Sequence, residues 1–212
     1  MKTILCYGDS LTWGYSAEGP SRHAFDDRWP NVLQAALGRD AHVIAEGLNG
    51  RTTAYDDHLA SADRNGARLL SSILVTHAPL DLVIIMLGAN DLKPFICGRA
   101  IGAKQGVQRL INIVRGTTYP FGEGPPDILI VSPPALCETA DPDFAAMFEG
   151  GIEESRMLAS LFSDLADAEE CGFFDAGSVA RTTPLDGIHL DAESTRAVGR
   201  GLEPVVRMML GM

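Results

Sequence analysis

The sequence predicts an α/β protein, a three-layer α/β/α sandwich with a five-stranded parallel sheet. Short apolar segments alternate with longer segments of helical periodicity, which is the pattern of a parallel sheet covered by helices on both faces. The strongest segment, residues 80–87, is apolar at nearly every position, as expected of a central strand buried on both faces. A chain of 212 residues suits one such domain, so we expect a single domain over residues 1–212.

Five segments are expected to form the strands. Each is a short run of apolar residues that lies between more polar stretches. The third run is the strongest and the fifth is the weakest. In chain order they cover residues 3–7, 42–45, 80–87, 128–131 and 172–174.

Helices are expected between these strands, where apolar residues recur three or four positions apart. Gly38 is expected to end the first helix, because glycine is favoured just after a helix. The last helix should begin at Asp191, a good N-cap, and run toward Met208, with Pro204 kinking or interrupting it. The four earlier helices include residues 32–37, 69–74, 107–114 and 143–170.

The composition disfavours several classes of protein. The net charge of −11 argues against a nucleic-acid-binding protein, which normally carries a basic patch. No run of 18 apolar residues occurs, so we expect no membrane span and no membrane partner, and the early first strand leaves no room for a signal peptide. The cysteines form no C-x-x-C pair, which is typical of free thiols in the cytoplasm. They are Cys6, Cys97, Cys137 and Cys171.

The sequence predicts neither a metal nor an organic cofactor. No Gly-x-Gly-x-x-Gly follows a predicted strand, so no nucleotide site is implied. Four histidines lack the spacing of metal ligands. They are His23, His42, His58 and His77.

Three residues have the chemistry of a serine hydrolase. Ser10 directly follows the first predicted strand, and Asp186 and His189 stand three residues apart near the other end of the chain. A serine hydroxyl becomes a useful nucleophile only when a neighbouring base accepts its proton, and histidine suits that role near neutral pH. A carboxylate such as that of Asp186 would orient the imidazole and stabilise its charged form.

Three groups could hold the oxyanion of a tetrahedral intermediate. They are the backbone N–H of Ser10, the backbone N–H of Gly50 and the side-chain amide of Asn90. These residues follow the first, second and third predicted strands. Because the carboxyl ends of parallel strands meet at one edge of a sheet, we expect all three to lie together there.

Each motif also has a structural interpretation when it is taken alone. Ser10 after a strand is typical of a helix N-cap, Asp186 with His189 of a loop salt bridge, and Asn90 of a turn. The G-x-S-x-G signature of α/β-hydrolases is missing, since Thr12 stands where its second glycine would be. Only the combination of motifs favours catalysis.

These residues, in this order, resemble the SGNH hydrolases, also called GDSL esterases. In the resemblance Ser10 matches the nucleophile, Gly50 the oxyanion glycine and Asn90 the amide donor. Asp186 and His189 match the D-x-x-H pair. Longer strings resemble the bacterial arylesterase/acyltransferase branch, including its perhydrolase members; they cover residues 11–14, 81–88, 131–134 and 173–179.

The likeness spans residues 3–205 and implies a flavodoxin-like form of the predicted sandwich. It implies hydrolysis of short-chain or aryl esters through an acyl-enzyme, acyl transfer to alcohols or peroxide, and assembly into a homo-oligomer. Some relatives carry alanine in place of Gly50, which should matter little because the donor is a backbone N–H.

Residues next to the nucleophile are candidate substrate contacts, and the partner we expect is a small-molecule ester. A carbohydrate O-acetylesterase, a thioesterase and a lysophospholipase on the same triad remain alternatives, as does a non-catalytic binding module that retains the fold. The candidate contacts are Asp9, Leu11, Trp13 and Tyr15.

Overall fold

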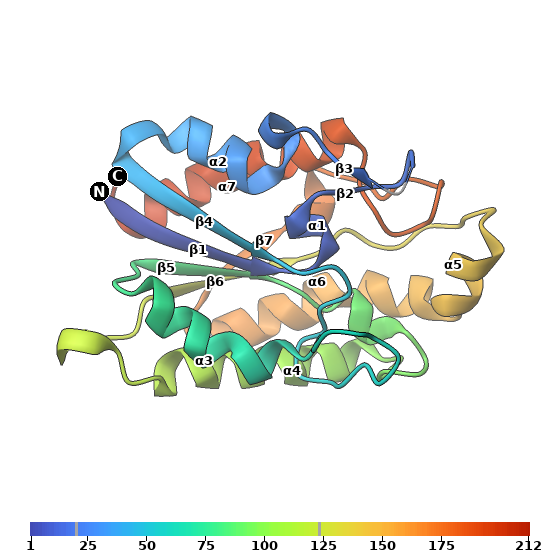
Figure 1. The fold of residues 1–212 in the computed structure, drawn as a ribbon, viewed down its shortest axis with the longest axis horizontal. Helices are drawn as coiled ribbons and strands as arrows, with labels where there is room; N and C mark the ends of the chain where they lie inside the picture. Colours follow the sequence, from blue (N-terminus) through green and yellow to red (C-terminus); the bar gives the residue numbers. More distant parts are fainter. Residues whose placement is uncertain (20, 123) are drawn as a thin grey trace.

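The computed structural model describes residues 1–19, 21–122 and 124–212. Its main sheet has five strands in the order β4-β1-β5-β6-β7, and every neighbouring pair is parallel (Figure 1). All five predicted strands are confirmed. They are β1 (Lys2–Gly8), β4 (Ala41–Gly47), β5 (Leu82–Met86), β6 (Asp127–Ser132) and β7 (Gly172–Asp175).

Helices cover both faces of this sheet, which confirms the three-layer arrangement (Figure 1). On one face lie α2 (Trp29–Leu37) and α7 (Ala192–Leu210), which pack against each other. On the other face lie α3 (Gly66–His77), α4 (Ala100–Gly116) and α6 (Gly151–Ala168).

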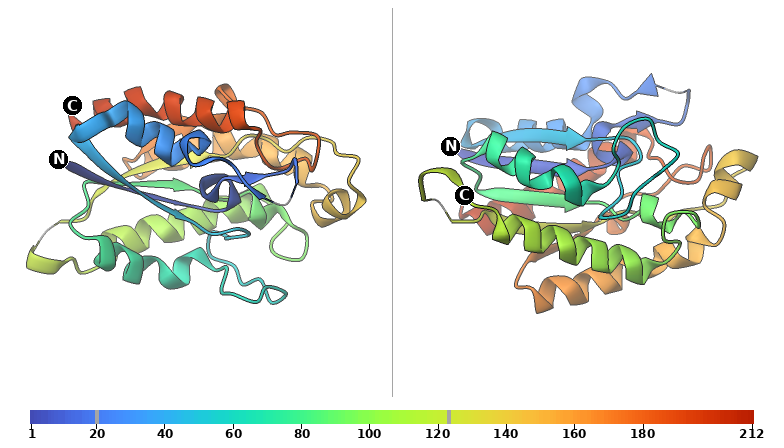
Figure 2. Two further views of the ribbon diagram at one scale, coloured as in Figure 1. Left: turned by 45° about the horizontal axis from the view of Figure 1, so that its top comes forward. Right: turned by 60° about the horizontal axis from the view of Figure 1, so that its bottom comes forward.

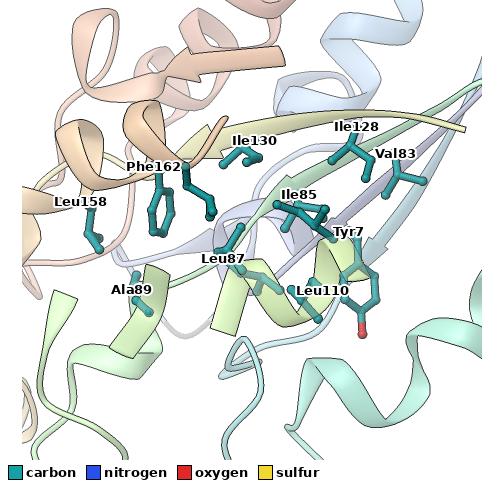
Figure 3. Packing of buried hydrophobic residues seen from close by; sticks show 14 of the residues in the cluster. Tyr7, Val83, Ile85, Leu87, Ala89, Leu110, Ile128, Ile130, Leu158 and Phe162 are labelled. Atoms are coloured by element: carbon teal, nitrogen blue, oxygen red, sulfur yellow. The ribbon is translucent and has the colours of Figure 1, made fainter. Parts of the chain in front are cut away.

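Alternate residues of the strands pack into two cores, one on each face of the sheet. In β5, Val83 and Ile85 join the core under α3, α4 and α6, whereas Leu82 and Ile84 join the core under α2 and α7. Figure 3 shows part of the first core, where Ile85 lies near Leu110 of α4. Apolar residues at successive positions of a strand are therefore all buried, as the near-continuous hydrophobic run predicted.

Several shorter elements complete the described chain. One is an antiparallel hairpin that pairs residues 15–16 with residues 21–22 and that the sequence did not predict. The elements are α1 (Ser10–Trp13), β2 (Tyr15–Ser16), β3 (Ser21–Arg22), α5 (Pro142–Met147) and the 3₁₀ turns η1 (Phe25–Asp27), η2 (Gly38–Asp40), η3 (Asn90–Leu92), η4 (Pro120–Gly122) and η5 (Ala176–Ser178).

One helix prediction was wrong in detail, and one of the two outcomes expected at Pro204 does not occur. The single helix expected over residues 143–170 is divided into α5 and α6, because Gly150 adopts a left-handed conformation with φ 74° and ends the continuity. Pro204 lies inside α7 but does not interrupt it, and Asp191 caps that helix by accepting a hydrogen bond from the Ser194 N–H (2.7 Å).

The order of the strands defines the edge where a site can form. The chain leaves β1 for β4 on one side and then crosses to β5 on the other, so the loops after β1 and β5 diverge at a topological switch point. Figure 2 shows α1 at the carboxyl end of β1, whereas both chain termini lie near the opposite end of the sheet. Among the described residues, no helix is long and apolar enough to cross a membrane.

Candidate active site

Ser10 lies at the tight turn between β1 and α1. Asp9 is the N-cap of this short helix, and Ser10 is its first residue. A Cβ on Gly8 would come within 2.0 Å of the Thr12 hydroxyl oxygen, so only glycine fits immediately before the turn. The turn holds Ser10 nearly buried, with its Oγ 2.9 Å from Nε2 of His189.

His189 is held on its other side by Asp186. Nδ1 of the ring lies 2.6 Å from Asp186 Oδ2, while Asp186 Oδ1 accepts from the backbone N–H groups of Ile188 (3.1 Å) and His189 (2.9 Å). Burial acts to raise the pKa of Asp186, but these hydrogen bonds outweigh it and hold that pKa below its ordinary value. Asp186 therefore stays ionised at neutral pH, as the orienter of a catalytic imidazole must.

Two aromatic rings enclose the imidazole of His189. The Tyr15 ring lies 4.1 Å from it, centroid to centroid, at an interplanar angle of 33°. The Phe144 ring meets it edge-on at 6.1 Å. These contacts restrict the rotation of a ring whose two nitrogens already have partners.

Gly50 and Asn90 stand at the same edge of the sheet as Ser10, after β4 and β5. Gly50 has φ 78°, a left-handed conformation that strains any residue with a side chain. Asn90 Nδ2 lies 3.2 Å from Asp9 Oδ2 and 3.3 Å from the carbonyl oxygen of Arg51. Both distances lie at or beyond the long end of the ordinary N–H···O range, so these contacts orient the amide within the site.

A cavity of about 170 Å³ is lined by Ser10, Gly50, Asn90 and His189. Asp186 lies behind the imidazole and lines a neighbouring cavity instead. Apolar side chains from α5 and from the loop that carries the histidine form much of its wall. No sequence motif marked the residues of α5, whereas Asn49, Lys93 and Ile188 stood beside motif residues that were already recognised. The wall consists of Ser10, Tyr15, Asn49, Gly50, Asn90, Lys93, Phe144, Met147, Phe148, Ile188 and His189.

A second cavity of about 390 Å³ lies next to the first. The two share Phe144, Phe148 and Ile188, so these three side chains form a partition between them. The wall of the second cavity also includes charged residues, among them Glu149 and Arg156.

Of the four predicted substrate contacts, only Tyr15 lies on the wall of the cavity that Ser10 and His189 line. Asp9 is buried beneath Asn90, with Oδ1 accepting from the Leu11 N–H (2.9 Å), and Leu11 packs in the core. The Trp13 ring lies under the Arg22 guanidinium at 4.5 Å. These three positions are corrected: they shape the turn around Ser10 rather than the cavity.

Arg51 makes hydrogen bonds that connect the loops carrying Ser10, Gly50 and Asn90. Its guanidinium donates to the backbone oxygens of Gly8 (2.8 Å) and Glu46, at the ends of β1 and β4, and lies 4.1 Å over the Tyr7 ring. Its own carbonyl oxygen accepts from the Asn90 amide. The side chain of Arg51 thus links the ends of β1 and β4, and its backbone carbonyl adds Asn90, which follows β5.

Two buried carboxyls lie beneath the site. Asp91 is fully buried and accepts hydrogen bonds from the Thr53 N–H (3.1 Å) and hydroxyl. Burial is the largest cause that raises the pKa of Asp9 and of Asp91, each to about 6. Since both values exceed the ordinary value of about 3.9, the folded state holds these protons more tightly than the unfolded chain does.

The free energy of unfolding should therefore fall as pH rises from about 4 to about 6. Asp91→Asn should remove up to about 3 kcal/mol of this fall, because one pKa unit corresponds to about 1.4 kcal/mol. Urea unfolding at several pH values in that range measures it, with Asp127→Asn, at an exposed aspartate, as the control. An unchanged slope in Asp91→Asn would contradict the assignment.

No group of three or more potential His, Cys, Asp or Glu ligands gathers within residues 1–19, 21–122 and 124–212. A metal-independent reaction remains a prediction from the sequence.

Comparison with known proteins identifies the family to which the chain belongs. The model of the GDSL-like lipase/acylhydrolase family matches residues 6–197. The chain belongs to this family, the SGNH hydrolases. As a member, it is a carboxylic ester hydrolase with the α/β fold of SGNH structures. No curated protein matches the sequence.

Solved SGNH structures resemble it over their whole length. A carbohydrate acetylesterase family member from Sinorhizobium meliloti is 71% identical, with a TM-score of 0.98 and complete coverage of both chains. An aryl esterase from M. smegmatis is 44% identical and Est24, a carbohydrate acetylesterase from Sinorhizobium meliloti, 38%. Their TM-scores are 0.92 and 0.93, and each covers 99% of this chain and 100% of its own.

Proposed function

We propose that Ser10, His189 and Asp186 are the catalytic triad of a serine esterase for short-chain or aryl esters. The observation that carries this proposal is the continuous hydrogen-bonded series Asp186–His189–Ser10 at the wall of a cavity that Gly50 and Asn90 also line. A helix cap or a loop salt bridge would not require the three residues to converge from opposite ends of the chain.

The reaction proceeds through an acyl-enzyme. His189 Nε2 accepts the Ser10 proton as Oγ attacks the ester carbonyl, and Asp186 stabilises the imidazolium. The N–H groups of Ser10 and Gly50 and the Asn90 amide stabilise the oxyanion. His189 then protonates the departing alcohol, and water activated by the same imidazole releases the acid.

The size of the cavity favours a small acyl group. Its volume of about 170 Å³ equals the space of roughly five or six water molecules at about 30 Å³ each. Aromatic rings on the wall, including Tyr15 and Phe148, offer flat apolar surface to an aryl group. Long-chain esters would need the partition to move.

The second candidate is deacetylation of carbohydrates, which is favoured by the similarity to a carbohydrate acetylesterase family member and to the carbohydrate acetylesterase Est24. Kinetic comparison of p-nitrophenyl acetate, acetylated sugars and an acyl-CoA, together with labelling of Ser10 by an organophosphonate, tests both candidates and the thioesterase alternative. A folded protein that is neither labelled nor active on any of these would be a binding module.

Acyl transfer to alcohols or peroxide and a homo-oligomeric state are further parts of the proposal, as is a cytoplasmic location, which fits the four free cysteines.

With an aryl acetate and an added primary alcohol, we expect new ester beside free acid, because the apolar wall leaves water few places to hydrogen-bond. Product partitioning by chromatography measures this. Free acid alone at every alcohol concentration would make the enzyme a plain hydrolase.

A further inference from the structure

Lys93 stands on the wall of the cavity that Ser10 and His189 line. It follows η3 directly, three residues after Asn90, and is only 8% exposed. Within the described parts of the chain, its ammonium group makes neither a hydrogen bond nor an ion pair. Its contacts are aromatic: Nζ lies 5.5 Å from the centre of the Phe148 ring and 6.0 Å from that of Phe95.

The mechanism of ester hydrolysis does not use this amine. Burial lowers the pKa of Lys93, while the charges of Asp57, Asp9 and Asp91 oppose that shift from a distance. A desolvated cation without a contacting anion is costly, and its cost falls when an anionic group enters the cavity.

Asn49 adds a second polar group without a partner to the same wall. It immediately precedes Gly50, and its Oδ1 is buried without any hydrogen bond among the described residues. Its Nδ2 likewise donates to no described residue. Besides the Tyr15 hydroxyl, Lys93 and Asn49 are the polar side chains of this wall that neither the triad nor the oxyanion site employs.

We propose that Lys93 binds a carboxylate carried by the substrate and so selects esters that bear a negative charge near the scissile bond. The inference rests on the proposed esterase function and names its substrate class. An ammonium donor suits a carboxylate because hydrogen bonds between charged groups are the strong ones. The net charge of −11 repels anions at long range, so any preference must come from local contact.

Two pairs of esters that differ only in charge test this. Monomethyl succinate against methyl succinamate carries the carboxylate on the acyl part, and 4-acetoxybenzoate against 4-acetoxybenzamide carries it on the alcohol part. In at least one pair we expect kcat/KM to favour the anion by roughly 10- to 100-fold, the range for a hydrogen bond to a charged group. The pair that shows it identifies the part of the substrate that Lys93 contacts.

Variants separate binding from a structural role. Lys93→Met should bring the anion-to-neutral ratio close to one, and Lys93→Arg should keep most of it. Lys104→Met, on α4, removes the same charge away from the cavity wall and should leave the ratio unchanged. Melting temperatures establish that each variant is folded.

The proposal is overturned if the wild type shows no preference in either pair. It is overturned equally if Lys93→Met lowers both members of a pair by the same factor, which would make Lys93 a structural counter-charge for Asp9 and Asp91. The wild type is assayed on p-nitrophenyl acetate in the same experiment. If it hydrolyses this ester, the proposed esterase function stands even when the Lys93 proposal is overturned. If the wild type does not hydrolyse it, the proposed esterase function fails, and the Lys93 proposal fails with it.

Discussion

Ser10→Ala should lower kcat for ester hydrolysis by roughly 10⁴- to 10⁶-fold, the usual cost of removing a serine nucleophile. No other hydroxyl in the cavity wall is hydrogen-bonded to His189, so nothing replaces Oγ. The fold should survive, because Ser10 makes its backbone contacts independently of the side chain. Turnover of p-nitrophenyl acetate and the melting temperature measure the two effects.

The matched control is Ser72→Ala, which removes an exposed hydroxyl on α3 and should leave kcat as in the wild type. A folded Ser10→Ala protein with a wild-type rate would remove the triad assignment. Retained organophosphonate labelling in that variant would point to another nucleophile.

Asn90→Ala should lower kcat by roughly 10²- to 10³-fold, or about 2.7–4 kcal/mol, the typical cost of one oxyanion donor. The loss should appear in kcat rather than in KM, since the amide would contact the oxygen most strongly when it becomes charged. Steady-state kinetics near pH 8 measures the effect well above the pKa of Asp9, about 6.

Asn112→Ala, at an exposed position of α4, is the control for the loss of an amide. If Asn90→Ala raised KM and left kcat intact, Asn90 would be a ground-state contact. Unchanged values of both would reduce it to a turn residue.

The sequence predicted the scaffold of the site better than its walls. Ser10, Gly50 and Asn90 each follow a strand whose apolar run was evident, and parallel strands bring such loops to one edge whatever their loops look like. Asp186 and His189 needed only a short span of chain to meet. Local patterns therefore determined which groups could converge.

The walls depend on packing between segments distant in the sequence. Phe144 reaches His189 because α5 is separated from α6 at Gly150, and a helical pattern that continues through this glycine conceals the break. Asp9 was expected to face substrate because it neighbours Ser10, yet the cap of a four-residue helix turns it inward to Asn90. The sequence could not predict the role that we infer for Lys93, because that inference depends on the absence of an ion pair within the described chain, which only the structure shows.

The partition of Phe144, Phe148 and Ile188 has a consequence for how such enzymes diverge. No residue of α5 is fully buried, so changes at Phe144 or Met147 cost less stability than changes in the sheet core. A smaller side chain at Phe144, which lines both cavities, would join them and admit longer acyl groups, while the loops that carry Ser10, Asp186 and His189 keep their geometry. Substrate range can therefore drift through neutral substitutions in one short helix, and close relatives can share catalytic groups yet prefer different esters.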